Sequence, residues 1–400
     1  MKCGKSGYSM NYDYRRVILT FTMLGFVSLF ADITYEGARS ISGDYLAYLN
    51  APAIVAGAVA IGEFLGYAIR LPSGLIASKY KSSKVVWFLT IVGYGLNLAI
   101  PLLALTGNWT YALAILIAER VGKGLRTPAR DLIVSDLTDR AIGRGKGFAI
   151  HEVLDQLGAV SGPLIVSYAI ALAKGYADAF LWLLPSALVA LTLITTAYTV
   201  YPELESFREA RAVVLKSYVS SIGAYSAFTF LLSIGFIHWS IISYHLGKTG
   251  AVATYVIPLF YAVAQGVDAL IALPLGWLYD KKGLSTLMML PLVSAAIPPL
   301  ILLSNNLAYL IMASGLYGVV MCSYETVIRA AVADLVEPQS RAAVFGAVGF
   351  LWGLAWMIGN IAGGAIYDAL GPRALAIVFS AVSLSSLIAL KLLLRRLRPH

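Results

Sequence analysis

Long apolar stretches follow one another through the chain, and only short polar stretches separate them. Of its 400 residues, 59% are hydrophobic and 13% are charged, whereas a soluble domain has roughly 25% charged residues. A helix needs about 20 mostly apolar residues to cross a bilayer, and roughly a dozen such helices fit into this length. We therefore expect an all-α membrane protein rather than a soluble one.

Hydropathy and the alternation of charge predict the number and direction of these helices. Basic residues collect in every second loop, as at Lys79, Lys81 and Lys84, and are scarce in the loops between. Because basic residues mark the cytoplasmic side, we expect both termini inside, which requires an even number of spans. The apolar run 17–31 lacks a small-residue cleavage site after it, so we expect it to remain as the first span. The twelve predicted helices are 16–46, 53–79, 84–106, 109–133, 145–174, 177–200, 217–246, 250–279, 285–304, 307–334, 341–370 and 373–394.

Composition and short motifs exclude several classes of function. The net charge of +9 raises the question of nucleic-acid binding, but the charges lie between apolar segments, so no nucleic-acid partner is expected. Cys3 and Cys322 are too few for a disulfide framework or a metal site, and His238 and His245 have no third ligand nearby in the sequence. The sequence has no glycine-rich phosphate-binding motif, so ATP is not the expected driver. We expect no metal and no cofactor.

The two halves of the chain resemble each other on either side of a polar midpoint. The segment 201–217, "YPELESFREARAVVLKS", is the longest polar stretch inside the chain and predicts a linker. We expect an N-terminal six-helix bundle over 1–200, a cytoplasmic linker over 201–216 and a C-terminal six-helix bundle over 217–400. Internal repeats are typical of secondary transporters. The matches are glycine, proline and charge, which argues against chance similarity between apolar helices: Pro72 and Pro274, Gly74 and Gly276, Asp136 and Asp334, Arg144 and Arg341.

Several motifs resemble those of the major facilitator superfamily, over nearly the full length of the chain. The stretch 276–283, "GWLYDKKG", is similar to the family's pattern, whereas the first-half copy departs from it at Ser78 and Lys81. The stretch 119–131, "ERVGKGLRTPARD", resembles a group of prokaryotic efflux permeases. The resemblance implies twelve transmembrane helices in two pseudo-symmetric six-helix bundles. Further matching positions are Arg120 and Gly124 in the family's helix-4 motif, and Gly158, Gly162 and Pro163 in its helix-5 motif.

The predicted fourth helix carries charge into the membrane, where an ionisable side chain costs at least about 2.5 kcal/mol. Glu119 and Arg120 lie about ten residues into this helix, near the midplane. Such side chains are tolerated where they face a watery cavity or a partner, so we expect the charged stripe to line the cavity wall or the inner gate. Gly122 and Gly124 are expected to let a neighbouring helix approach closely. The stripe, at spacings of four, three and four residues, consists of Glu119, Lys123, Arg126 and Arg130.

Helices 1 and 10 each carry acid and base on one face. Asp32, Glu36 and Arg39 are spaced by four and three residues in helix 1. Asp32 has no partner nearby in the sequence and is the better proton or substrate site, whereas Glu36 and Arg39 form either a substrate contact or an intrahelical pair. Glu325 and Arg329 are four residues apart, so either a self-satisfying pair or a substrate contact is expected. Two acids have no partner nearby in the sequence, and each is expected to contact either a neighbouring helix or the substrate: Glu63 and Asp268.

Asp155 in helix 5 lies at a depth similar to that of Glu119. Burial favours the neutral form of a carboxylic acid, and a nearby cation favours its charged form. We therefore expect Asp155 to pair with Arg120 or Lys123, and separation of this pair could couple a proton to a conformational step. A permanent salt bridge is the alternative. We expect His151 to lie close to the surface.

Two pairs at the cytoplasmic ends of helices are expected to take part in gating. Arg130 and Asp131 meet the inner surface, where snorkelling of Arg130 is the favoured alternative. Gly276 and Asp280 belong to the motif after helix 8, and Asp280 is expected to cap the start of helix 11 through the helix dipole. Ser78, at the matching place in the first half, supplies no charge. We therefore expect the two halves to stabilise the closed state to different degrees.

Three functions are open at this point. The first is a secondary transporter that exports a small organic solute in exchange for protons, because buried acids permit proton coupling and the helix-5 motif resembles that of antiporters. The second function is import of an organic anion by uniport or symport, suggested by Arg39, Arg120, Lys123, Arg126 and Arg329. The third function, an intramembrane enzyme or a receptor, has neither a catalytic motif nor a large extramembrane domain to support it.

We expect a monomer in the cytoplasmic membrane that contacts the lipid bilayer, a small-molecule substrate and protons.

Overall fold

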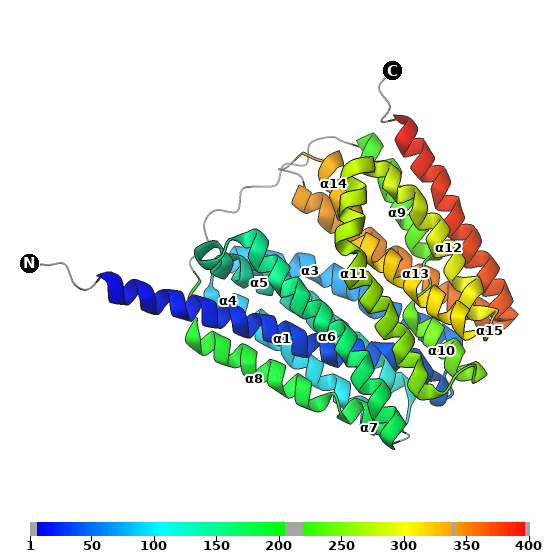
Figure 1. Cartoon of the computed structure of the whole chain (residues 1–400), viewed down its shortest axis with the longest axis horizontal. Coiled ribbons are helices and arrows are strands. Elements are labelled where there is room, and N and C mark those ends of the chain that lie inside the picture. The colour runs from blue at the N-terminus through cyan, green and yellow to red at the C-terminus, as the bar shows by residue number, and fades with distance from the viewer. Residues whose placement is uncertain (1–5, 174, 205–218, 338–340, 397–400) are drawn as a thin grey trace, which may run out of the picture.

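The helices of this chain form two groups that meet at one end (Figure 1). The computed structural model describes residues 6–173, 175–204, 219–337 and 341–396, and every element in these ranges is an α-helix or a short 3-10 helix. Helices α1 to α8, drawn from blue to green, make the first group, and α9 to α15 make the second. The predicted all-α fold is confirmed.

The first group makes six membrane crossings. Three of these crossings each join two elements: α2 with α3, α4 with η1, and α7 with α8. The elements are α1 (Ser6–Tyr48), α2 (Ala53–Ala58), α3 (Ala60–Tyr80), α4 (Ser83–Gly95), η1 (Leu96–Leu105), α5 (Trp109–Ala141), α6 (Arg144–Ala173), α7 (Tyr176–Leu181) and α8 (Leu184–Val200).

The second group contains more interruptions. The chain leaves helical geometry between α9 and α10 at residues 236–238, and Thr326 separates α13 from α14. The long element α15 is two helices joined at Gly371, directly before Pro372. The elements are α9 (Val219–Gly235), α10 (Trp239–Thr249), η2 (Thr254–Val256), α11 (Ile257–Lys282), η3 (Gly283–Met288), α12 (Met289–Leu302), α13 (Leu307–Glu325), α14 (Val327–Leu335) and α15 (Arg341–Arg396).

The number of crossings follows from length and from two glycines. Nine segments of the described residues are long and apolar enough to cross a membrane, but two of them contain 49 and 52 residues. A layer about 30 Å thick needs about 20 helical residues, so each of these segments must fold back. They break at Gly283 and Gly371, whose φ angles of 56° and 83° lie in the left-handed region that glycine tolerates. Separating these two pairs, and counting the more polar α5, gives the twelve crossings that the sequence predicts.

Helix α5 packs between α3 and α4 because its glycines admit them. A methyl group on Gly122 would stand 2.7 Å from the carbonyl oxygen of Gly93. A methyl group on Gly124 would stand 2.8 Å from the carbonyl oxygen of Gly66. No side chain fits at such distances, so the predicted close approach is confirmed. The charged helix α5 is thereby enclosed by protein rather than by lipid.

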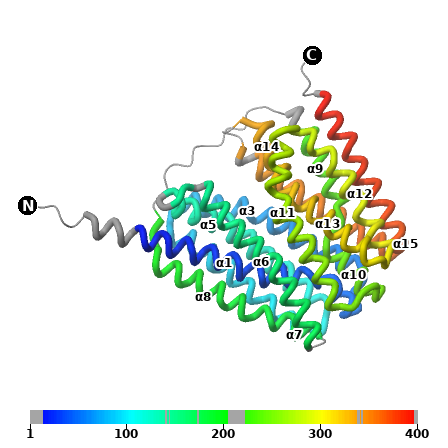
Figure 2. The backbone as a smooth tube through the Cα atoms, in the orientation of Figure 1, coloured from blue at the N-terminus to red at the C-terminus, as the bar shows by residue number. Residues whose placement is uncertain are grey.

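The two groups are joined by a cluster of hydrogen bonds that we call the clasp, made by Asp368, Ala53, Ile54, Tyr244 and Ala51. The carboxylate of Asp368 in α15 accepts hydrogen bonds from the backbone N–H of Ala53 at 2.8 Å and of Ile54 at 2.9 Å. Tyr244 of α10 donates its hydroxyl to the carbonyl of Ala51 at 2.9 Å. Within the described residues, α1 begins and α15 ends away from this junction near α10 (Figure 2).

The predicted linker falls mostly outside the described residues, since 205–218 are not among them. Before this gap the backbone N–H of Leu204 donates to the hydroxyl of Ser83 at 2.9 Å, which ties the end of the first group to α4. The predicted domain bounds therefore stay a prediction. Cys322 is a buried free thiol, as expected, and Cys3 lies outside the described residues.

Candidate functional site

Glu63 of α3 is the centre of a charged network that we call the central network: Glu36, Arg39, Glu63, Glu119, Arg120, Arg126 and His238. Its Oε1 atom lies 3.2 Å from Nη2 of Arg39 and 3.1 Å from Nε of Arg120. Nε2 of His238, from the break between α9 and α10, lies 3.9 Å away. Glu63 therefore contacts neighbouring helices, which is one of the two predicted alternatives, and its partners come from helices distant in the sequence.

The central network also joins the two groups through Glu36 of α1. Tyr261 of α11 donates its hydroxyl to Oε2 of Glu36 at 2.5 Å, and Nη1 of Arg39 lies 3.6 Å from Oε1. The predicted Glu36–Arg39 pair is therefore confirmed, but each member also has a partner from another helix. The guanidinium of Arg39 lies 5.8 Å from the ring centroid of Trp356 in α15, within reach of a cation–π interaction.

The charged side chains of the α5 stripe contact two different helices, α4 and α1. Glu119 lies 3.4 Å from Nε of Arg120 and 3.6 Å from Nη2 of Arg126. Arg126 donates to the carbonyl of Gly93 in α4 at 3.2 Å, and it is buried. Lys123 instead donates to the hydroxyl of Tyr35 in α1 at 2.6 Å. The expectation that Glu119 and Arg126 avoid lipid is confirmed by their burial, but Arg126 packs against α4 rather than facing a shared cavity.

A second group of charges, the Arg130 cluster, consists of Arg130, Asp131, His151, Asp155 and Ser28. Arg130 lies 2.9 Å from Oδ1 of Asp131 and 3.7 Å from Oδ2 of Asp155. Its side chain is only 18% exposed, so the snorkelling interpretation is wrong. His151 is 3% exposed and lies 3.0 Å from the Ser28 hydroxyl, so its predicted surface position is also wrong. Helix α6 packs on α1 here and buries both side chains.

Asp155 pairs with Arg130. The predicted pairing with Arg120 is wrong because Arg120, nearer the start of α5, pairs with Glu63 of α3. Lys123 lies near enough for its charge to act on both Asp155 and Asp32. Among the residues that the structure describes, none forms an ion pair with Asp32 within 4.0 Å. Two acids of α1 and α6 therefore share one lysine of α5.

The acids of the second group are arranged differently. Glu325 ends α13, and Thr326 (φ −109°, ψ −73°) interrupts the helix before Arg329. The predicted self-satisfying pair is wrong: in the described part of the chain the two side chains form no ion pair within 4.0 Å, because the break removes the helical spacing that would bring them together. Asp268 of α11 is 4% exposed and has no ion-pair partner among the described residues either.

The residues predicted to gate lie at the ends of helices. Asp131 contacts Arg130, as described above. Asp280 is exposed at the end of α11 and accepts no hydrogen bond from any residue within the described ranges. The sequence predicts that Asp280 caps the eleventh predicted helix, 341–370, which is the first part of α15, and this cap is not formed in this structure. Gly276 has open space where a side chain would begin, with nothing within 4 Å. The expectation that these residues move during gating stays a prediction.

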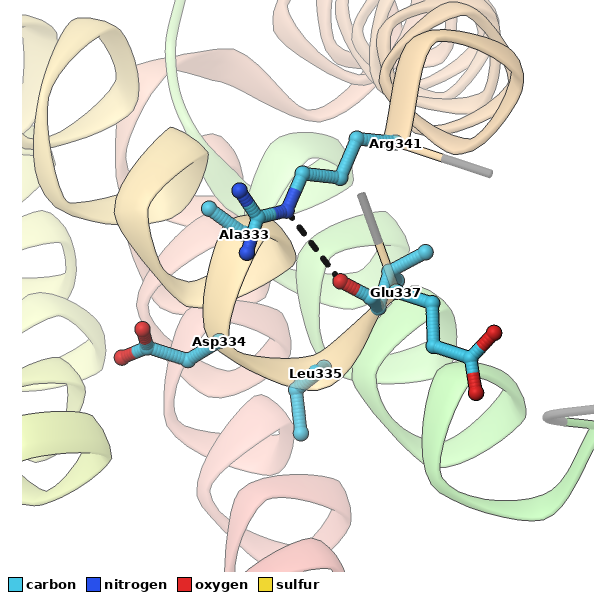
Figure 3. Close-up of a pocket in the computed structure, with 6 residues that line it drawn as sticks. Ala333, Asp334, Leu335, Glu337 and Arg341 are labelled. Carbon is cyan, nitrogen blue, oxygen red and sulfur yellow. Dashed lines mark hydrogen bonds between the residues drawn. The ribbon is translucent and has the colours of Figure 1, made fainter. Parts of the chain in front are cut away.

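A polar hollow lies at the turn between α14 and α15 (Figure 3). Arg341 donates from Nε to the carbonyl of Val336 at 3.2 Å, and Asp334 and Glu337 lie at its edge. Asp334 accepts the hydroxyl of Tyr279 at 2.7 Å, just as its repeat partner Asp136 accepts that of Tyr201 at 3.1 Å. This shared contact supports a structural role for the repeat motif, and we do not place the substrate in the hollow.

A small cavity of about 20 Å³ adjoins the central network. Such a volume holds about one water molecule rather than an organic solute. Several buried polar atoms around it have no hydrogen-bond partner in the described protein, among them Nη1 of Arg120 and Oε1 of Glu119. The lining residues are Tyr35, Arg39, Ser42, Val59, Glu63, Ile100, Leu116, Glu119 and Arg120.

Two residues of this site were missed by reasoning from the sequence, Glu63 and His238. The only signal for Glu63 was a carboxylate within an apolar stretch, which shows that a partner is needed but not which one. For His238 the sequence suggests only the role of a metal ligand, and no third ligand lies nearby. In the described residues no three His, Cys, Asp or Glu side chains are placed to hold a metal ion. Its position at a helix break beside Glu63 depends on tertiary packing.

Known proteins resemble this chain over most of its length. The family model described as Major Facilitator Superfamily matches residues 219–400. An uncharacterized protein of Mycobacterium tuberculosis is 35% identical over 92% of this chain and 91% of its own length. An uncharacterized MFS-type transporter of Methanocaldococcus jannaschii is 24% identical over 84% of this chain and 85% of its own length.

Solved structures share the same fold. The nucleoside transporter NupG superposes with a TM-score of 0.70 at 14% identity, over 95% of this chain and 100% of its own. An inward-facing, unoccupied bacterial homologue of the human lysosomal transporter Spinster superposes with a TM-score of 0.68 at 12% identity, over 94% of this chain and 95% of its own. At such low identity the likeness concerns the fold.

Proposed function

The second half of the chain matches the Major Facilitator Superfamily model, and the whole chain shares the fold of solved transporters. From this premise we propose that the chain belongs to this superfamily and exports a small organic solute across the cytoplasmic membrane in exchange for protons. It is a multi-pass membrane protein and a secondary transporter, not an enzyme. Family membership, solute identity, direction and proton coupling are the parts proposed here.

Proton coupling is supported by one observation above all: Asp32 has no ion pair among the described residues, whereas Asp155 pairs with Arg130, and Lys123 lies within electrostatic range of both acids. An unpaired carboxylate within a membrane helix is costly when charged and can bind a proton. Loading one acid with a proton frees Lys123 for the other. The proton would therefore alter the contacts between α1, α5 and α6.

Export is supported by the resemblance of residues 119–131 to efflux permeases and by the glycines of α6. A methyl group on Gly162 would stand 2.7 Å from the backbone nitrogen of Gly37, so α1 and α6 are in close backbone contact. A proton that binds between α1 and α6 would act on this tight interface.

Alternating access would use different contacts at the two ends of the bundles. We place both termini and the linker 201–216 in the cytoplasm, with the bundles over 1–200 and 217–400. The clasp would hold the external end shut, while Arg130, Asp131, Gly276 and Asp280 would act at the cytoplasmic end. The solute would enter between the bundles, close to the central network and the acids of α11 and α13.

Import of an organic anion has less support. Of the cations on which it rests, Arg39, Arg120 and Arg126 have carboxylate partners, and Lys123 is held by Tyr35. Only Arg329 lacks an ion pair among the described residues. An anion would therefore have to displace several buried carboxylates, each of which would be left without its partner.

The test uses the purified full chain in liposomes that contain a pH-sensitive dye. A panel of organic cations, anions and neutral compounds is offered with and without a pH gradient. We expect at least one compound to move only when protons move in the opposite direction, and Asp32→Asn to abolish this proton movement. The matched control is Glu203→Gln, at an exposed position after α8. Solute flux that ignores the pH gradient would contradict the proposed coupling.

A further inference from the structure

We propose that the solute is an organic cation whose ammonium group binds between α6, α11 and α13, at an acceptor cluster made of Glu152, Gln265, Asp268 and Glu325. This inference rests on the proposed function and names the substrate class of the same transport pathway. Its members contribute carboxylate and amide oxygens, which are hydrogen-bond acceptors.

The three carboxylates come from both bundles and influence one another's charge. Asp268 lies within electrostatic range of Glu325 and Glu152, and Glu325 lies within range of Glu152. Glu152 is exposed in the space beside α6, and its only described hydrogen bond comes from Gln156 at 3.4 Å. Like charges near one another repel, so the buried Asp268 and its neighbours favour a positively charged ligand.

A second observation points to a ligand at the same place. Gln265 is 6% exposed, and its Oε1 atom accepts no hydrogen bond within the described structure. Tyr261, Gln265 and Asp268 are spaced by four and three residues, so they share one face of α11. That face looks toward the first bundle, because Tyr261 donates its hydroxyl to Glu36 there. A buried amide oxygen without a donor is costly, and a bound ammonium would satisfy it.

The neighbouring cations act on two acids of the cluster, but within the described residues none of them forms an ion pair with its acids. Lys123 is bonded to Tyr35, and Arg130 is paired with Asp131. Arg329 acts on Glu325 at a distance, but the break at Thr326 holds the two side chains more than 4.0 Å apart in this structure. Lys123 also lies within electrostatic range of Glu325, and Arg130 and Arg329 lie within range of Glu152. Asp268 is the acid of the cluster that has neither an ion pair among the described residues nor a cation among the charges that act on it most strongly, so a bound ammonium would be its ion-pair partner.

A metal ion is a poorer fit than an organic cation. The cluster does not bring three carboxylates close enough to hold an ion, as noted above for all described residues. Aromatic rings lie at the same level of α13: Tyr324, which precedes Glu325, stacks on Trp352 with centroids 4.0 Å apart, and the centroid of Tyr67 lies 6.0 Å from that of Tyr324. Rings beside acids suit a cation that carries an apolar or aromatic body.

The experiment compares two ligands of similar shape and opposite charge, phenylbutylammonium and phenylbutanoate. Equilibrium binding to the purified full chain is measured for wild type, Asp268→Asn, Glu325→Gln and the control Glu203→Gln. We expect the ammonium compound to bind and the carboxylate compound not to bind. Loss of either acid should weaken binding of the ammonium compound by about tenfold or more, and the control should bind like wild type. Thermal unfolding of each variant identifies any that fails to fold.

Binding of phenylbutanoate in preference to phenylbutylammonium would overturn the inference, and so would equal binding of the ammonium compound by folded Asp268→Asn and Glu325→Gln. The flux assay with the pH dye separates this failure from that of the proposed function. Proton-coupled flux of an anionic or neutral compound would leave the proposed function intact and overturn the substrate class. Binding and flux of the ammonium compound without proton movement would leave the substrate class intact and overturn the proton coupling in the proposed function.

Discussion

The two bundles use charge inside the membrane in opposite ways. In the N-terminal bundle several acids pair with bases, and one carboxylate, Glu63, serves two arginines, whereas Asp32 has no ion pair among the described residues. The membrane ion pairs between described residues all take their acid from this bundle, whereas Asp268 and Glu325 of the C-terminal bundle have none. Paired charges hold helices together, while unpaired acids are available to a proton or a ligand. The difference suggests that one bundle supplies the framework and the other supplies much of the binding surface.

Neutralising Glu63, the carboxylate that two arginines of the N-terminal bundle share, should have the largest effect on stability. Glu63→Gln leaves Arg39 and Arg120 buried without their shared carboxylate, so we expect a loss of about 3–5 kcal/mol in the free energy of unfolding. The measurement is reversible unfolding in mixed detergent micelles. Adding Arg39→Gln to Glu63→Gln should recover part of the loss, since one uncompensated charge is removed with it. A change below about 0.5 kcal/mol, the size usual for surface substitutions, would contradict the framework role.

Opening the clasp should have the next largest effect, on conformation rather than on pairing. Asp368→Ala leaves the N–H groups of Ala53 and Ile54 without their acceptor. Because Asp368 and Ile54 are exposed, water replaces part of the loss, and we expect a cost of about 0.5–1.5 kcal/mol for each hydrogen bond. We expect a cysteine placed at buried Val55 to react about tenfold faster with a membrane-impermeant maleimide, since about 1.4 kcal/mol corresponds to a factor of ten. Asp368→Asn keeps one acceptor oxygen and should show a smaller increase. Unchanged reactivity in both variants would show that the clasp does not hold this end shut.

Removing a partly exposed pair should matter less. Asp155→Asn leaves Arg130 with Asp131, and both side chains of the Arg130–Asp155 contact are 18% exposed. Solvent screens such a contact, so we expect a loss of only about 1 kcal/mol in the free energy of unfolding. The same detergent titration checks this value. A loss as large as that of Glu63→Gln would mean that the Arg130 cluster belongs to the framework as firmly as the central network.

Neutralising the unpaired acids should have the smallest effect on stability. Asp268→Asn and Glu325→Gln remove charges that repel each other and have no ion-pair partner among the described residues, so we expect no loss and a gain of up to about 1 kcal/mol. Unfolding of both variants beside Glu63→Gln sharpens the contrast between the bundles. A loss of several kcal/mol in the free energy of unfolding would show that these acids have a stabilising partner. The contrast between a paired N-terminal bundle and an unpaired C-terminal bundle would then no longer hold.

The fold could be predicted from the sequence because its cause is local. Apolar runs of membrane length mark each helix, and Gly283 and Gly371 mark the two turns that interrupt the longest runs. The close approach at Gly122 and Gly124 was predictable for the same reason, since a missing side chain has one main consequence in a packed helix.

The partners in the site could not be predicted, because they lie far apart in the sequence. Spacing of three or four residues finds pairs on one helix, and it correctly found Glu36 with Arg39. It could not find Glu63 with Arg120, which needs the packing of α3 on α5. It failed for Glu325 with Arg329 because the helix breaks between them, and no glycine or proline marks Thr326 as the breaking point.

The central claim is that an unpaired acid carries the proton while the paired charges hold the bundles, and Asp32→Asn tests it most directly. Solute exchange and pH-driven net flux are measured side by side in liposomes, once the flux panel has identified a transported compound. We predict that exchange continues at a rate near that of wild type while net flux driven by the pH gradient is lost. Net flux that stays at the wild-type level, with the variant fully folded, would contradict the claim.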